Sequence, residues 1–229
     1  MRLALRLAGL TAAFAAPAAA AWAQPVVVEL FESQGCSSCP PANANLAAIT
    51  ARPDVIALNF AVTYWNGPGW TDTFGTRAFT ARQWDYAHAF HRPQVFTPQI
   101  VVDGRRDGVG IDPAEFARLV GRGSAAAATP ILRLTAGAVT IGAAAAQAQP
   151  ADVWLVRYDP RTLPVAIRGG ENGGRTLPHK NIVKQLVRLG GWSGAAETLR
   201  LPRPPAPGLV DAVLVQTPRG GPILAAAKG

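Results

Sequence analysis

Two cysteines near the start of the chain, Cys36 and Cys39, have the type and spacing needed for dithiol chemistry. They are the only cysteines, and two serines separate them in the sequence GCSSCPP. At the start of a helix, backbone N–H groups and the helix dipole stabilise a thiolate and lower the pKa of the first thiol. The second thiol, one helical turn further on, can resolve a mixed disulfide. We therefore assign Cys36 as the nucleophile and Cys39 as the resolving thiol of a redox-active disulfide.

The flanking residues predict the elements that such a pair requires. Residues 26–31 (VVVELF) form a short, β-branched apolar run that is typical of a buried strand. Residues 42–51 predict a helix, and Pro40 and Pro41 fit its first turn, where a missing N–H group costs nothing. A CxxC placed between a strand and a helix is much more specific than two cysteines alone.

The rest of the first half continues this alternation of strands and helices. Apolar runs, Gly/Pro turns and helix-capping residues predict the order β-α-β-α-β-β-α, an α/β layout. The expected strands are 26–31, 55–63, 99–102 and 106–111, and the expected helices are 42–51, 76–91 and 112–121.

The second half has a different character. Residues 123–130 (GSAAAATP) predict a linker, so we expect one domain at 24–123 and a second at 130–229. Short apolar runs separated by Gly-rich or polar turns predict a small, β-rich, sandwich-like domain. Its expected strands are 131–134, 138–141, 153–158, 164–167, 210–216 and 222–226; residues 181–189 fit both a helix and a strand.

Four stretches carry a resemblance to known families. From residue 24 to about residue 121 the chain resembles the thioredoxin superfamily, and the whole chain after residue 23 resembles the secreted bacterial family of domain of unknown function 1223. The resemblance implies a thioredoxin-like domain, with a central mixed sheet flanked by helices, but no particular activity. The matching stretches are 28–42 (VELFESQGCSSCPPA), 58–74 (LNFAVTYWNGPGWTDTF), 95–105 (VFTPQIVVDGR) and 168–194 (RGGENGGRTLPHKNIVKQLVRLGGWSG).

The resemblance also implies a role for Thr97 and Pro98. Thioredoxin-like proteins carry a cis-proline at this position, packed against the CxxC and exposing backbone groups to a substrate chain. One feature departs from the pattern: the buried acid usually found six residues before the first cysteine is replaced by Leu30. Glu29 and Glu32 lie nearby, and either is a candidate to replace that acid.

Two further groups are candidates for binding. Trp65 and Trp70 lie in a Gly/Pro-rich loop and either form an aromatic rim that binds peptide substrates or pack as an ordinary loop. His88 and His91 lie near the end of a predicted helix and, together with the cysteines, are candidate ligands of a copper ion. Two residues between the thiols is not the usual copper-carrier spacing, and we expect no metal and no cofactor.

The Gly-rich stretch Arg168–Arg175 (RGGENGGR) allows two interpretations. Its arginines, with Glu171 and Asn172, could bind an anion or a carboxylate. Alternatively, Glu171 pairs with Arg168 or Arg175 and holds the two domains together. The stretch lacks the Lys-Ser/Thr and the following helix of a phosphate-binding loop.

Residues 1–23 are typical of an export signal. Arg2 and Arg6 precede an apolar run of small residues, and Ala21-Trp22-Ala23 offers a cleavage site before Gln24. We expect a periplasmic or secreted protein with no membrane span after cleavage. The net charge of +8 is scattered rather than clustered, which argues against nucleic acid as a partner.

These observations predict an exported thiol–disulfide oxidoreductase acting on protein thiols or disulfides of the cell envelope. Two alternatives remain open at this point. One is a binding module in which the Cys36–Cys39 disulfide is a permanent staple, and the other is a thiol protein of copper handling or haem maturation. The sequence does not predict the oligomeric state.

Overall fold

A computed structural model describes residues 24–67, 69–121, 130–145 and 150–229. The expected signal at 1–23 and the expected linker, apart from Pro130, lie outside the described residues. The first half contains β1 (Val26–Glu32), α1 (Cys39–Ile49), β2 (Val55–Ala61), α2 (Arg77–Ala89), β3 (Gln99–Val102), β4 (Arg106–Gly108) and α3 (Pro113–Gly121). The second half contains β5 (Leu132–Leu134), β6 (Ala138–Ile141), β7 (Ala151–Ala166), β8 (Thr176–Trp192), β9 (Glu197–Arg200), β10 (Val210–Gln216) and β11 (Ile223–Lys228).

The first half follows the predicted order, β-α-β-α-β-β-α, around a mixed sheet. β1 and β2 are parallel, and every residue of β1 pairs with one of β2 from Val26↔Val55 to Glu32↔Ala61. β3 is antiparallel to β1, and β4 is antiparallel to β3. Both faces of β1 and β2 are buried, as expected for central strands that read as continuous apolar runs.

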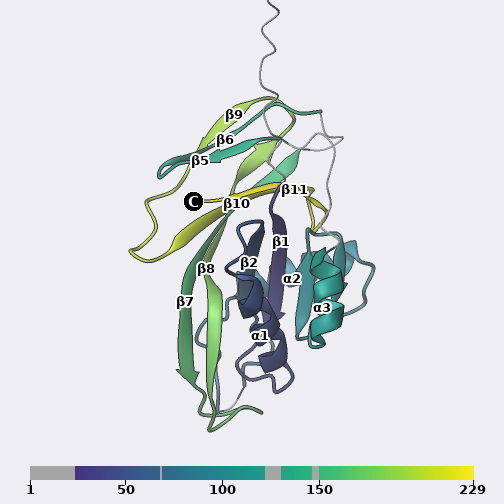
Figure 1. Cartoon of the computed structure of the whole chain (residues 1–229), viewed down its shortest axis with the longest axis vertical. Helices are drawn as coiled ribbons and strands as arrows, with labels where there is room; N and C mark the ends of the chain where they lie inside the picture. The colour runs from purple at the N-terminus through teal and green to yellow at the C-terminus, as the bar shows by residue number, and fades with distance from the viewer. Residues whose placement is uncertain (1–23, 68, 122–129, 146–149) are drawn as a thin grey trace, which may run out of the picture.

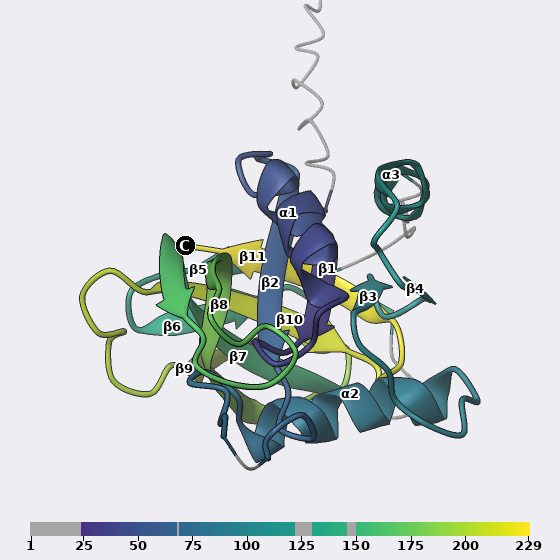
Figure 2. The ribbon, with the colours of Figure 1, turned by 90° about the horizontal axis from the view of Figure 1, so that it is seen from below.

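The helices cover the two faces of this sheet. α1 and α3 lie on one face, and α2 lies on the other (Figure 2). Leu30 of β1 faces a cluster that includes Leu46 of α1 and Phe116 of α3. Phe31, the next residue, faces the opposite cluster with Phe79 of α2. The strand's twofold alternation therefore joins both helical layers to one sheet.

Most strands of the β-rich half join the sheet of the first half rather than form a separate sheet. β11, β10, β7 and β8 extend the sheet of the first half in the order β11-β10-β7-β8-β2-β1-β3-β4. The two halves meet where β8 runs parallel to β2 at Ile182↔Asn59 (Figure 1). The sandwich-like part exists, because the small sheet β5-β6-β9 shares a core with β7 and β10 through residues such as Val139, Leu155 and Val213.

The structure corrects one local expectation and settles a stretch that the sequence left open. The strands expected at 153–158 and 164–167 are one strand, β7, and the turn between them is a bulge. Asp159 accepts hydrogen bonds from the backbone and the guanidinium of Arg161 there, and Pro160, which has no N–H to donate, fits an interrupted ladder. The ambiguous stretch 181–189 is strand, because it lies within β8 between β7 and β2.

Candidate functional site

The two cysteines lie where β1 ends and α1 begins. Cys39 is the first residue of α1 and Ser38 is its N-cap, so the helix starts three residues earlier than expected. Ser38 makes no side-chain capping bond; its Oγ instead lies 3.2 Å from the Sγ of Cys36. Both cysteines are free thiols and both are buried, with exposed fractions of 0 % for Cys36 and 1 % for Cys39.

The surroundings move the pKa values of the two thiols in opposite directions. A hydrogen bond from the thiol of Cys39, opposed by burial and aided by the hydroxyls of Ser38 and Thr97, lowers the pKa of Cys36 to about 6. Burial, the hydrogen bond that it donates to Cys36 and the charge of Glu32 raise the pKa of Cys39 far above its usual range. The pair is therefore suited to hold a thiolate at Cys36 and a thiol at Cys39.

Thr97 connects the dithiol to the aromatic loop. Its side chain stabilises the thiolate form of Cys36, and its Oγ1 accepts a hydrogen bond of 2.7 Å from the Nε1 of Trp65. The peptide bond between Thr97 and Pro98 is cis, as expected. Trp65 thus lies at the redox pair, packed partly against the core on the α2 side of the sheet.

Of the two glutamates near the cysteines, Glu29 has a carboxylate that is paired with side chains of α2. Its carboxylate accepts hydrogen bonds from Arg82 at 2.6 and 3.2 Å and another from the hydroxyl of Tyr86, all of them buried. This fully paired cluster fixes α2 to β1. Glu29 therefore serves packing rather than the thiols.

Glu32 has the surroundings of a proton-exchanging acid. It is fully buried and lies next to Asn43, whose Nδ2 donates to Oε2 at 3.2 Å, while the Nε2 of His179 is 3.8 Å from Oε1. Burial, followed by the charge of Asp72, raises the pKa of this carboxyl well above its usual value, and the charge of Cys36 adds to the effect. Burial lowers the pKa of His179, so its imidazole is neutral. The sequence did not single out His179 as part of this group.

The segment before Cys36 is held from one side by Asp72. Its Oδ2 accepts hydrogen bonds from the Oγ of Ser33 at 3.2 Å and from the backbone N–H of Gln34 at 2.7 Å. The side chain of Gln34 in turn exchanges hydrogen bonds with Thr73. Residues 72 and 73 therefore fix the approach to the dithiol, a role that no sequence pattern indicated.

The Arg168–Arg175 loop holds the same segment from the other side. Glu171 accepts hydrogen bonds from the N–H and the Oγ of Ser37 at 3.0 and 2.7 Å. The Nδ2 of Asn172 donates to the carbonyls of Gln34 and Cys36 at 3.0 and 2.8 Å. The expectation that Glu171 pairs with an arginine to join the two halves is thus half right: the loop does join them, but Glu171 bonds to Ser37.

Trp70, His88 and His91 contact residues other than the cysteines. The backbone of Trp70 closes a small turn with Gly67, and Cβ of Trp70 lies beside Gly169 of the Arg168–Arg175 loop. His88 lies against Trp84 near the end of α2, with ring centroids 5.7 Å apart. Among the described residues, no group of three or more His, Cys, Asp or Glu side chains is arranged to hold a metal ion.

Fold and site together define a mixed α/β protein with an enclosed pair of cysteines between its first strand and first helix. The chain belongs to the family described as protein of unknown function (DUF1223), whose model matches residues 27–216. This match covers every residue of the site described above.

Two solved structures are similar to this one. A crystal structure of a protein from Agrobacterium tumefaciens is 30 % identical over 89 % of this chain and 92 % of its own, with a TM-score of 0.71. HBP35 of Porphyromonas gingivalis is similar in fold, with a TM-score of 0.58 at 14 % identity over 91 % of this chain and 76 % of its own. A comparison with curated proteins gives no match. None of the helices among the described residues is long and apolar enough to cross a membrane.

Proposed function

We propose that the protein is an exported thiol–disulfide oxidoreductase of the cell envelope, and that its first half is a thioredoxin-like domain. The observation that carries this proposal is the placement of the pair: Cys39 begins α1 shortly after β1, and Thr97, which precedes the cis peptide bond to Pro98, hydrogen-bonds to Cys36. The opposite displacement of the two thiol pKa values, to about 6 at Cys36 and far upward at Cys39, supports it. A permanent staple has no need of such an asymmetry, whereas thiol–disulfide exchange needs one attacking thiolate and one thiol held in reserve.

The reaction follows from these roles. The thiolate of Cys36 attacks one sulfur of a partner disulfide, forming a mixed disulfide and releasing the partner's other sulfur as a thiolate, which takes up a proton. Cys39 then loses its proton and attacks the Sγ of Cys36. The Cys36–Cys39 disulfide forms, and the partner leaves with both sulfurs reduced. The reverse sequence oxidises a partner dithiol with the same atoms.

Glu32 is the proton acceptor that the proposal assigns to Cys39. A carboxyl whose pKa is raised from its usual value towards neutrality exchanges protons effectively near neutral pH. Glu32 is buried, interacts electrostatically with both thiols and keeps one carboxylate oxygen, Oε1, free of a hydrogen bond. It would therefore fill the role of the acid that Leu30 replaces in the sequence pattern.

Thr97 and Pro98, with Trp65, would form the surface that receives the partner. Thr97 touches both the thiolate and the indole of Trp65, so a chain laid along it passes beside Cys36. Residues 1–23 would direct the chain out of the cytoplasm and into an oxidising compartment, in which partner disulfides occur.

The test is the reduction potential of the Cys36–Cys39 pair, measured by alkylation in a series of glutathione and dithiothreitol buffers. A potential between about −120 and −270 mV is expected, in the range of exchange catalysts. A potential below about −300 mV marks a structural disulfide and would move the protein to the binding-module class.

A further inference from the structure

The Arg168–Arg175 loop touches every residue of the segment that leads into and out of Cys36. The backbone N–H of Glu171 donates to the carbonyl of Gly35 at 3.2 Å. Together with the bonds from the side chains of Glu171 and Asn172, this contact means that each of the four residues 34–37 bonds to this one loop. More than 130 residues of chain separate the two partners.

The buried part of this contact, made by Asn172 and Gly170, fits closely against the Cys36 segment. Asn172 is wholly buried, and its Oδ1 accepts a hydrogen bond of 2.6 Å from Arg175, which fixes which end of the amide faces the Cys36 segment. At Gly170, which has a φ of +71°, a Cβ would come within 3.2 Å of the Cα of Gly35. Backbone and side chains thus fit together without space for a larger residue.

The outer part of the contact places a charge beside the dithiol. Ser37 lies between the two cysteines, and its N–H and hydroxyl both bond to the carboxylate of Glu171, which lowers the pKa of that carboxyl. Glu171 is therefore placed to hold the loop closed against the segment between the two cysteines.

We propose that the Arg168–Arg175 loop is a gate over the redox pair, and that Glu171 and Asn172 are the positioning residues that keep it closed. Cys36 is completely buried, and the loop holds its carbonyl and both of its neighbours, so release of these contacts frees the segment that carries the thiol. The inference rests on the proposed function only in naming Cys36 as the thiol that a partner must reach.

The experiment measures the rate at which iodoacetamide alkylates Cys36 in the reduced protein, using a Cys39→Ala background so that one thiol reacts. Glu171→Ala removes both hydrogen bonds from Ser37 and should raise this rate at alkaline pH by about fivefold or more. Glu171→Gln keeps an acceptor for Ser37 and should therefore raise the rate by a smaller factor. The temperature of global unfolding should change little in either variant.

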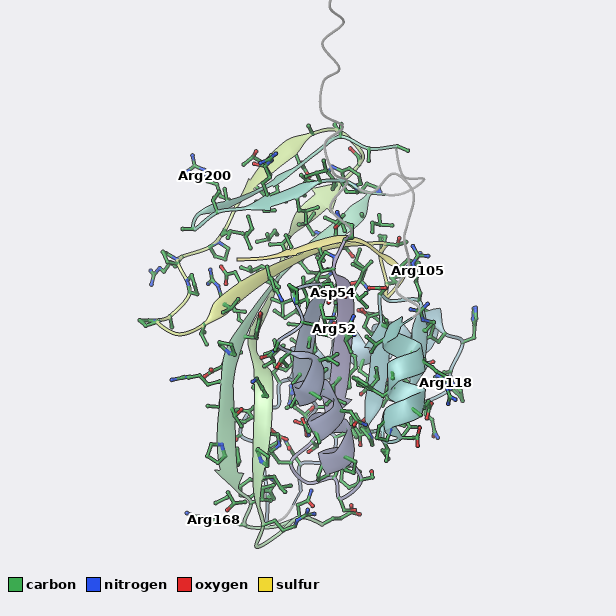
Figure 3. All side chains as sticks on the ribbon, in the orientation of Figure 1. Arg52, Asp54, Arg105, Arg118, Arg168 and Arg200 are labelled. Carbon is green, nitrogen blue, oxygen red and sulfur yellow. The ribbon has the colours of Figure 1, made fainter. Side chains whose placement is uncertain are left out.

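The control is Arg168→Ala, in the same loop, because the side chain of Arg168 points away from the molecule (Figure 3). Its rate should match that of the parent protein. Ser37→Ala, which removes one donor to Glu171, should fall between Arg168→Ala and Glu171→Ala. The gate is refuted if Glu171→Ala, Ser37→Ala and Arg168→Ala all alkylate at the parent rate.

These outcomes are separable from the proposed function. A reduction potential in the structural range with a strong Glu171→Ala effect would reject turnover and keep the gate. A reduction potential in the catalytic range, together with no effect of Glu171→Ala on alkylation, would support turnover and reject the gate.

Discussion

Cys36 has a low pKa although it is buried, and burial alone raises the pKa of a thiol. The compensation comes from the thiol of Cys39, the hydroxyls of Ser38 and Thr97, and the backbone N–H of Ser38. Cys39 is the largest cause that lowers the pKa of Cys36, whereas burial is the largest cause that raises the pKa of Cys39, followed by the hydrogen bond to Cys36. The asymmetry is a property of the pair and depends on the reduced state of both sulfurs.

Cys39→Ala should therefore raise the pKa of Cys36 from about 6 towards the ordinary thiol value of 9.0. The check is the pH dependence of Cys36 alkylation by iodoacetamide. Ser38→Ala removes a smaller contribution and should move the midpoint upward by less. Equal midpoints in the two variants would contradict the ranking of the donors.

Glu32→Gln should slow resolution of the mixed disulfide, because the proton of Cys39 loses its acceptor. The measurement is the rate at which a preformed mixed disulfide at Cys36 releases its thiol. Asn43→Ala, which removes only the hydrogen bond to Glu32, is the control and should keep most of the rate. Resolution at the parent rate in Glu32→Gln would remove Glu32 from the mechanism.

The same substitution should stabilise the folded protein at alkaline pH. The pKa of Glu32 is higher in the folded than in the unfolded chain, so folding favours the protonated form, and stability falls as pH rises through the folded pKa. At about pH 8, Glu32→Gln should raise the free energy of unfolding by roughly 1 kcal/mol or more, since each unit of raised pKa corresponds to about 1.4 kcal/mol. Below the ordinary carboxyl pKa of 4.5 this gain should disappear. Urea unfolding at the two pH values measures the difference.

The sequence predicted the position of the cysteines better than the contacts that support them. Their place between a strand and a helix follows from a local motif, the cis peptide at Thr97–Pro98 follows from a family resemblance, and both are present in the structure. Asp72 and Asn172 were not predicted, because each bonds to a segment far away in the chain. No local period or spacing encodes such a pairing.

At the scale of elements, two loops meet beside the redox pair, and glycines make the approach possible. A Cβ on Gly169 would lie 2.5 Å from the carbonyl oxygen of Gly69, which is backbone and cannot turn away. The aromatic loop and the Arg168–Arg175 loop therefore pack backbone against backbone. Trp70 lies at this junction, which fits the loop-packing interpretation of that residue.

Gly169→Ala should separate these loops and lower the free energy of unfolding by about 1–3 kcal/mol, the usual effect of overpacking. Gly67→Ala is the matched control, because a Cβ there meets no atom within 4 Å and should cost less than about 0.5 kcal/mol. Thermal unfolding followed by circular dichroism compares the two. An equal loss of stability in both variants would contradict the close approach.

Elements with strong local signals were predicted almost to the residue. β3 was expected at 99–102 and is found there, and α2 differs from expectation by one residue at its start and two at its end. The second half was harder, because Pro160 indicates a turn locally, while pairing with β8 on both sides of the bulge holds β7 together as one strand. Tertiary pairing overrode the local signal there.

At the scale of the whole molecule, the two halves share one sheet and one core. Residues of the second half, such as Val156, Val183 and Leu214, belong to the cluster that also contains Phe31 and Phe60. Neither half buries its apolar surface alone. The mixed α/β class and the β-rich region follow from the sequence, whereas the continuity of the sheet depends on the pairing of β8 with β2, which the apolar runs do not specify.

A fragment of residues 24–121 should therefore not fold into a stable unit, because it exposes one face of its core and the edge of β2. Residues 24–229 should unfold in a single cooperative transition. Near-ultraviolet circular dichroism and denaturant unfolding of both proteins make the comparison. Native-like aromatic signals and a cooperative transition in the fragment would show that the first half is an independent domain.

The hydrogen bond between Asn172 and the carbonyl of Cys36 has a consequence for the order of events during synthesis and folding. A ribosome makes the cysteines long before it makes residue 172, so the nascent chain carries an open, reactive dithiol. An oxidant can reach both sulfurs at this early stage, when the loop that encloses them has not yet been synthesised. The oxidation state of the Cys36–Cys39 pair can therefore be set before this contact forms.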